Sequence, residues 1–223
     1  MQVQGIPAAE AGDGVYRWLI RGPAGAGDPF DRHVFACAIA AVLASPCRSL
    51  PAGLGLPPDW AGLLLATHFP HAARLLAGER RDDGPAAPEE PDLRDLLIEH
   101  RSRGTTEELW LAHVVARRSL GANHLWQDMG LTCRADLSQL MRRHFRRLAE
   151  RNDRDMKWKK FFYRELCRRE GVVVCKSPNC DICSDFAHCF GEEKGDSPVV
   201  APAGSPGPRH EEWGDRHAYR HHQ

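Results

Sequence analysis

The chain has 223 residues, 42 % hydrophobic and 27 % charged, a composition that suits one soluble domain of medium size. Its 30 basic and 30 acidic side chains balance, so the overall charge predicts neither nucleic-acid nor membrane binding. The longest uncharged apolar run, 34–44, is too short to cross a bilayer. No basic segment leads into an apolar run at the amino end. We therefore expect a cytoplasmic protein without a membrane span.

Helical periodicity dominates the hydrophobic pattern. Asp28-Pro29 is typical of a helix start, and Thr105 with Glu108 three residues later forms a capping box. An alternating pattern typical of strands is nowhere sustained. The sequence therefore predicts an all-α fold with helices over 28–44, 57–67, 71–77, 92–102, 105–120, 135–150 and 155–169. The first is apolar on nearly all sides and should lie at the centre of the core.

Composition divides the chain into three parts. Residues 1–27 are rich in glycine and are expected to form a flexible amino-terminal segment. Residues 28–194 are expected to form the helical domain, with a proline-rich linker at 78–92 and a cysteine-rich loop at 175–189. Residues 195–223 contain histidines, prolines and glycines without apolar clustering, so we expect a disordered tail there.

The cysteine-rich loop is the feature that points to chemistry. Four of the eight cysteines, Cys175, Cys180, Cys183 and Cys189, fall within fifteen residues with spacings of four, two and five. The residues between them are too polar for a buried core. Disulfides are a poor explanation in a chain of this length without an export signal. A metal site is therefore the favoured interpretation.

Two kinds of metal site remain open on spacing alone. Three clustered thiolates separated by four and two residues favour an iron–sulfur cluster. A structural zinc ion also accepts four cysteines, but it usually draws on two short-spaced pairs, and only Cys180 and Cys183 form one here. Weaker candidate ligands are His188 inside the loop and His124 and Asp128 in a predicted turn, where Asp128 would serve equally well in capping.

Basic residues are concentrated around this loop. Segment 134–176 holds fourteen lysines and arginines but only six acidic residues. Lys157, Lys159 and Lys160 precede the loop and could balance an anionic cluster, attract an oxyanion such as molybdate, or dock an acidic partner. The aromatic residues in this stretch follow the inward-facing helical stripe rather than a base-stacking surface, so we do not expect nucleic-acid binding.

Several segments together resemble one family. These are FDRHVFACAIA at 30–40, NHLWQDMGL at 123–131, LSQLMRRHF at 137–145, DMKWKKFFYRELC at 155–167, and the four-cysteine loop closing in CFGEE at 189–193. The chain resembles the NifQ family of nitrogen-fixation proteins on these residues. The cysteine spacing matches the motif of that family at every position.

The resemblance implies a carrier rather than an enzyme. NifQ proteins are understood to hold an iron–molybdenum–sulfur cluster and to donate molybdenum for biosynthesis of the nitrogenase iron–molybdenum cofactor. It implies that Cys175, Cys180, Cys183 and Cys189 bind the cluster. Molybdate would be the molybdenum source, and the cofactor-assembly scaffold and the nitrogenase iron protein would be the partners. The alternative is a small zinc-stabilised helical adaptor with a basic face for a partner; neither interpretation includes a catalytic group.

Overall fold

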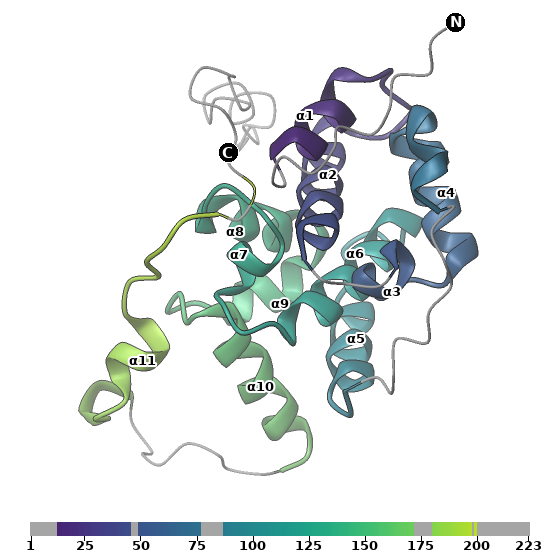
Figure 1. Cartoon of the computed structure of the whole chain (residues 1–223). Helices are drawn as coiled ribbons and strands as arrows, with labels where there is room; N and C mark the ends of the chain where they lie inside the picture. Colours follow the sequence, from purple (N-terminus) through teal and green to yellow (C-terminus); the bar gives the residue numbers. More distant parts are fainter. Residues whose placement is uncertain (1–12, 46–48, 77–86, 172–179, 198, 200–223) are drawn as a thin grey trace, which may run out of the picture.

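The computed structural model describes residues 13–45, 49–76, 87–171, 180–197 and 199. No strand occurs among them, which confirms the all-α prediction. The elements, shown in Figure 1, are α1 (Asp13–Arg21), α2 (Pro29–Ala44), α3 (Leu50–Leu54), α4 (Pro58–His68), the 3₁₀ helix η1 (Pro70–Leu76), α5 (Glu90–Glu99), α6 (Thr106–Ser119), α7 (Leu125–Asp128), α8 (Arg134–His144), α9 (Arg146–Arg151), α10 (Trp158–Arg169), the 3₁₀ turn η2 (Cys180–Ile182) and α11 (Phe186–Phe190).

Helix α2 is the centre of the core, as its sequence, apolar on nearly all sides, predicted. The Asp28 side chain caps its first turn by accepting hydrogen bonds from the backbone N–H groups of Phe30 and Asp31, at 2.9 and 3.3 Å. Nearly all side chains from Phe30 to Val42 are buried. Helix α1 lies along one side of α2 (Figure 1). The predicted capping box of α6 is also present, with Glu108 N–H donating to the Thr105 hydroxyl.

A buried polar network joins three of these helices. The imidazole Nε2 of His144 on α8 lies 2.7 Å from Asp31 Oδ1 on α2. On its other side, His144 Nδ1 lies 3.8 Å from Glu108 Oε1 of α6. All three side chains are at most 5 % exposed. Arg143 beside them pairs with the capping carboxylate of Asp28 at 2.7 Å. Because residues 113 positions apart meet here, the network fixes α8 against α2.

The same network extends into the backbone between α5 and α6. Glu108 accepts hydrogen bonds from the backbone N–H groups of Arg103 and Gly104, at 2.9 and 2.7 Å. Ser102 donates its N–H to the carbonyl of His144 at 2.9 Å. The Ser102 hydroxyl in turn accepts from the N–H of Arg146 at 3.0 Å. Both hydrogen bonds of Ser102 are made at the junction between α8 and α9.

The single helix predicted over 135–150 is therefore two helices. Helix α8 ends at His144, α9 begins at Arg146, and Phe145 between them has φ −133° and ψ 48°. The break is stable because Ser102 satisfies the backbone groups on both sides of it. The side chain of Phe145 is fully buried. A tertiary contact thus overrides a continuous helical periodicity.

Four further helices, α1, α3, α7 and α11, were not expected from the sequence. Helix α1 lies within the segment 1–27 that we expected to be flexible, and Leu19 anchors it in the core. Helices α3 and α7 are single turns, too short for periodicity to show. The segment predicted as a helix at 71–77 is the 3₁₀ helix η1. Residues 1–12, most of the linker (77–86) and 200–223 lie outside the described residues.

None of the helices that the structure describes combines the length and the apolar character needed to cross a bilayer.

Removing one partner from the buried network should strongly destabilise the fold. We expect Asp31→Ala to lower the free energy of unfolding by about 3 kcal/mol, because it leaves His144 buried without its nearest partner. Urea denaturation measures this. Asp59→Ala is the matched control, since Asp59 also lies in the first turn of a helix but is exposed. Equal unfolding free energies for the two variants would contradict a central role for the network.

Candidate metal centre

The described part of the cysteine loop consists of two short helical turns. Cys183 donates its N–H to the carbonyl of Cys180 at 3.1 Å, which closes the turn of η2. In a 3₁₀ turn, side chains three positions apart lie one above the other. The two thiols at Cys180 and Cys183 therefore project from the same side of the turn. Phe186 then donates its N–H to the Cys183 carbonyl at 3.1 Å and begins α11.

The third thiol lies where the loop is attached to the helical domain. Cys189 accepts a hydrogen bond at its carbonyl from the N–H of Lys157, directly before α10, at 2.9 Å. Cys189 and Phe190 are partly buried against the main core. Phe190 also stacks on Phe186 with ring centroids 4.7 Å apart. The carboxyl end of α11 at Cys189 is thus fixed to the domain, whereas η2 and the start of α11 extend beyond the bundle at the lower left of Figure 1.

The fourth cysteine, Cys175, lies outside the described residues. Within the described ranges, no three histidine, cysteine, aspartate or glutamate side chains gather closely enough to hold a metal ion. Cys180, Cys183 and Cys189 are all partly exposed and form no disulfide. The described loop therefore presents three thiols of the kind that bind soft metals, but they are not drawn together into a closed ligand set.

Basic side chains lie against this loop from two directions. Arg164 on α10 places Nη1 4.0 Å from Sγ of Cys180. Lys157 donates from Nζ to the carbonyl of Ala187 at 3.3 Å. The guanidinium carbon of Arg154 lies 5.4 Å from the centre of the Phe190 ring. This part of the loop thus has positive charge beside it, an arrangement that favours bound anions.

The segment that follows the loop is held by a buried carboxylate. Glu193 has 4 % of its side chain exposed, and its Oε1 lies 2.7 Å from Nη1 of Arg134 at the start of α8. The same oxygen lies 3.6 Å from Nδ1 of His124. Arg134 also donates to the carbonyl of Met156, two residues before α10, at 3.1 Å. Arg134 and Glu193 therefore connect α8 to the segments on both sides of the cysteine loop.

Packing of this segment continues past the predicted start of the tail at residue 195. The side-chain amide of Gln127 donates to the carbonyl of Asp196 at 3.2 Å. Gly195 has φ +115°, a backbone conformation that favours glycine over residues with a β-carbon. Val199 is buried against α2. The expected boundary is corrected accordingly, because these contacts fix the chain through 195–197 and again at Val199.

The three weaker candidate ligands have different surroundings. Asp128 is buried, forms an ion pair with Lys159, and accepts a hydrogen bond from the Asn123 amide at 3.1 Å. It therefore stabilises the turn, and burial lowers the pKa of Lys159 although Asp128 opposes the shift. His124 faces Glu193 rather than the thiols. His188 is exposed on α11, one position before Cys189, and is the remaining candidate within the loop.

A sequence model of the NifQ family matches residues 34–191. The chain belongs to the NifQ family. It is 39 % identical over 189 residues to a protein NifQ homolog of Sinorhizobium fredii, covering 80 % of this chain and 78 % of that protein. It is 41 % identical over 156 residues to protein NifQ of Azotobacter vinelandii, covering 65 % of this chain and 80 % of that protein.

A third NifQ protein, from Rhodobacter capsulatus, is 35 % identical over 161 residues, covering 70 % of this chain and 89 % of that protein. No solved structure matches this chain. The range matched to the NifQ family includes all four cysteines of the loop and ends just before Glu193.

Sequence reasoning did not identify Arg134, Gln127 or Glu193 as organising residues. Glu193 stands beside Glu192 in a polar segment, and only the fold distinguishes the buried carboxylate from the exposed one. A signal for Gln127 was present, because a side-chain acceptor three residues after a helix start is a capping pattern. Its Oε1 accepts from the N–H of His124 at 3.2 Å, as that pattern predicts.

Loss of the Glu193 carboxylate should release the segment after the cysteine loop. We expect Glu193→Ala to speed amide hydrogen exchange over 186–197 by at least about tenfold, because a buried ion pair with Arg134 is lost. Exchange within α2 should remain slow. Glu192→Ala is the control, since that side chain is 78 % exposed and pairs with exposed Lys194. The same exchange rates in both variants would show that Glu193 does not hold this segment.

Proposed function

We propose that this chain is a molybdenum carrier. It would hold an iron–molybdenum–sulfur cluster as cargo and supply molybdenum for biosynthesis of the nitrogenase iron–molybdenum cofactor. The observation that carries the proposal is the position of Cys180, Cys183 and Cys189 on a peripheral loop beside basic residues, in a member of the NifQ family. The described part of the loop is attached at Cys189 and exposed at Ile182, which suits a cargo that must be both held and released.

The ligand types agree with a mixed-metal cargo. Thiolates are soft ligands that hold iron and sulfide well, whereas oxidised molybdenum also accepts oxygen and nitrogen donors. We infer that at least three of the four thiolates hold the iron–sulfur part, with Cys175 as the fourth donor. Molybdenum would then occupy an exposed position with one weakly held ligand. His188 is suited to that role because it is exposed on the same helix as Cys189.

The local charge supports an anionic cargo. A cluster with its thiolates carries net negative charge, which low-polarity surroundings oppose unless cations lie nearby. Arg164 beside Cys180 and Lys157 beside Ala187 supply such cations. Both belong to α10 or the residue just before it, so this helix would stabilise the loaded loop.

The proposed role requires transfer rather than turnover. We expect the chain to receive molybdenum derived from molybdate in the cytoplasm and to pass it to the cofactor-assembly scaffold and the nitrogenase iron protein. No catalytic step is assigned to any residue. The competing function is a small zinc-stabilised adaptor, which uses the same four cysteines but holds a single permanent ion.

Metal content tests the cargo directly. Protein prepared without oxygen should contain iron and molybdenum by elemental analysis and should absorb visible light, whereas a zinc protein is colourless. We expect each Cys→Ala substitution at Cys175, Cys180, Cys183 and Cys189 to lower iron and molybdenum content by at least about half, because a thiolate ligand is lost. Cys133→Ala is the control, since this partly exposed cysteine lies outside the loop at the start of α8.

Two outcomes would overturn the carrier proposal. The first is unchanged iron and molybdenum content in all four loop variants. The second is stoichiometric zinc in the anaerobic protein, which would favour the adaptor instead.

We propose that a recipient docks on basic residues other than most of those expected from the sequence. Lys159 forms an ion pair with the buried Asp128, and Lys157 donates a hydrogen bond to the carbonyl of Ala187 in the loop. Two of the three expected lysines therefore have structural roles. Lys160, Arg164 and Arg168 instead recur every four residues along the exposed side of α10. Side chains at this spacing share one helix face, so they form a basic ridge next to the cysteine loop.

Charge reversal on this ridge should slow delivery without emptying the carrier. We expect Lys160→Glu/Arg168→Glu to reduce the rate of molybdenum transfer to the assembly scaffold by about three- to tenfold at low salt. Metal content should stay near the wild-type value, because neither residue contacts a thiol in the described structure. Arg142→Glu/Arg147→Glu, on exposed positions of α8 and α9, is the matched control. Equal transfer rates for the two double variants would refute a docking role for the ridge.

A further inference from the structure

Two large apolar side chains are exposed on the cysteine loop itself. Ile182, directly before Cys183, is 76 % exposed, which is the highest value among the large hydrophobic residues that the structure describes. Phe186, the first residue of α11, is 40 % exposed. A single exposed apolar residue is common on a protein surface, but apolar side chains grouped beside a functional site indicate an interaction surface. Neither side chain has a metal-binding atom, so holding a cargo does not account for them.

The two side chains continue an apolar path from the core. Phe190 packs against the main core, and its ring stacks on that of Phe186 with centroids 4.7 Å apart. The backbone N–H of Phe186 donates to the carbonyl of Cys183, the residue after Ile182, at 3.1 Å. Exposure rises along this path from Phe190 to Phe186 and then to Ile182. The path therefore leads out of the bundle, in the direction in which η2 extends in Figure 1.

Basic side chains border this path on the side of α10. The guanidinium carbon of Arg154 lies 5.4 Å from the centre of the Phe190 ring. Arg164 places Nη1 4.0 Å from Sγ of Cys180. The loop has no lysine or arginine of its own between Cys180 and Phe190. The positive border is therefore supplied by α10 and the chain before it, and it would complement acidic groups on a partner.

The exposed apolar side chains also lie next to the proposed cargo ligands. Ile182 precedes Cys183 in the turn that is closed by the backbone hydrogen bond between Cys180 and Cys183. A protein that takes metal from these thiols must therefore come within reach of Ile182. Arg164 belongs both to this border and to the basic ridge of α10. The ridge, the thiols and the apolar pair thus form one continuous surface.

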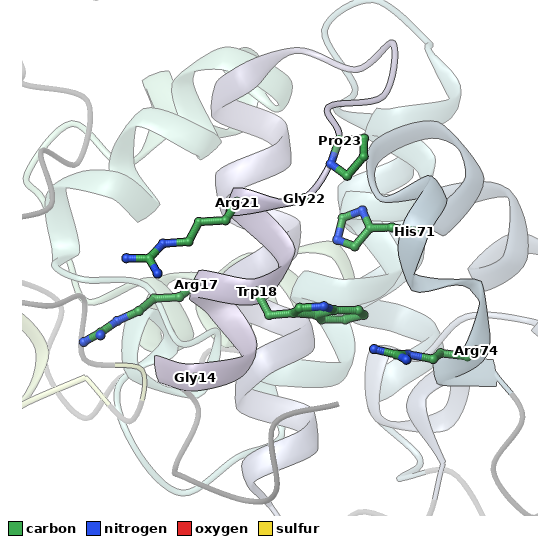
Figure 2. Close-up of a pocket in the computed structure, with 8 residues that line it drawn as sticks. All are labelled: Gly14, Arg17, Trp18, Arg21, Gly22, Pro23, His71 and Arg74. Carbon is green, nitrogen blue, oxygen red and sulfur yellow. The ribbon is translucent and has the colours of Figure 1, made fainter. Parts of the chain in front are cut away.

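The cavity of about 550 Å³ between α1 and η1 differs from this surface. Figure 2 shows that His71 and Arg74 approach Trp18 across it. The guanidinium carbon of Arg74 lies 4.9 Å from the centre of a Trp18 ring, and His71 meets the same indole edge-on at 5.0 Å. The large apolar ring of the cavity thus contacts side chains of its own chain, whereas Ile182 is largely exposed.

We propose that Ile182 and Phe186 form the apolar contact through which the recipient of the metal docks on the loop. This inference rests on the proposed carrier function and adds the kind of surface that the recipient presents. That surface is an apolar pocket bordered by acidic side chains, with the pocket over Ile182 and the acidic groups facing Lys160 and Arg164. The apolar contact supplies affinity and excludes water from the thiols, while the basic ridge orients the recipient.

Binding of the anaerobically loaded full chain to the purified cofactor-assembly scaffold, measured by surface plasmon resonance, tests the contact. We expect Ile182→Ser to weaken binding by at least about tenfold, because an apolar side chain buried in the complex is lost. Phe186→Ser should weaken it by at least about threefold for the same reason. Leu63→Ser is the matched control, since Leu63 is 56 % exposed on α4, on the opposite side of the bundle in Figure 1, and it should leave binding unchanged.

Salt separates the apolar contact from the basic ridge. Raising the salt concentration from about 0.05 M to about 0.5 M screens exposed charges, so the effect of Lys160→Glu/Arg168→Glu should shrink. The loss of affinity in Ile182→Ser should persist at both concentrations. Arg21→Glu, at an exposed arginine that lines the cavity of Figure 2, is the charge control and should leave binding unchanged.

The docking proposal would be overturned if the loaded wild type did not bind the scaffold, or if Ile182→Ser bound it as tightly as the wild type does. Two other uses of Ile182 would give that second result. If Ile182 shielded the cargo, Ile182→Ser would instead lose molybdenum faster to a chelator. If a second copy of the chain covered it, the wild type would sediment as a dimer and the variant as a monomer.

Metal content separates failure of docking from failure of the carrier role. Iron and molybdenum are measured in every variant before the binding experiment. Normal metal content in the wild type, together with unchanged scaffold binding by Ile182→Ser, would refute the docking contact alone. A wild-type protein without iron and molybdenum would refute the carrier role, and the docking proposal with it.

Discussion

The contact between His144 and Asp31 is the interaction on which the arrangement of the domain depends. It is short, at 2.7 Å, fully enclosed, and joins α8 to the central helix α2. Glu108 on its far side adds α6 and the backbone before it. Because a buried polar group without its partner costs several kcal/mol, this network penalises any other placement of α8. The position of α8 in turn places Arg134, which reaches both Glu193 and the chain that leads into α10.

This framework divides the molecule into a rigid support and an exposed loop. The support is a large hydrophobic core that includes residues from α1 to α10. The cysteine loop lies at its edge, attached through the backbone of Cys189 and the buried Glu193. The described thiols are not drawn together into a ligand set, and cations already lie beside them. On the carrier proposal, the loop would close around its cargo with little cost to the fold of the support.

Positive charge has three different roles in this chain. Arg32 and Lys159 are structural, because they pair with helix-end carbonyls and with a buried carboxylate. Arg164 lies against a thiol and suits an anionic cargo. Arg21 and Lys160 are exposed and lack a carboxylate partner among the described residues, so they are available to ligands or partners. The net charge of zero does not reveal this division. The role of each basic residue depends on the groups around it and not on the total number of charges.

The sequence alone determined the helical class, the central position of α2, the capping of α2 and α6, and the cysteine spacing with its family. These properties depend on local periodicity and on residues close together in the chain. Only the tertiary structure decided that Phe145 interrupts a continuous periodicity, that Lys159 is paired with Asp128, and that Glu193 is the buried member of an acidic pair. Each of these depends on partners 31 to 59 positions away, whose proximity no local pattern encodes.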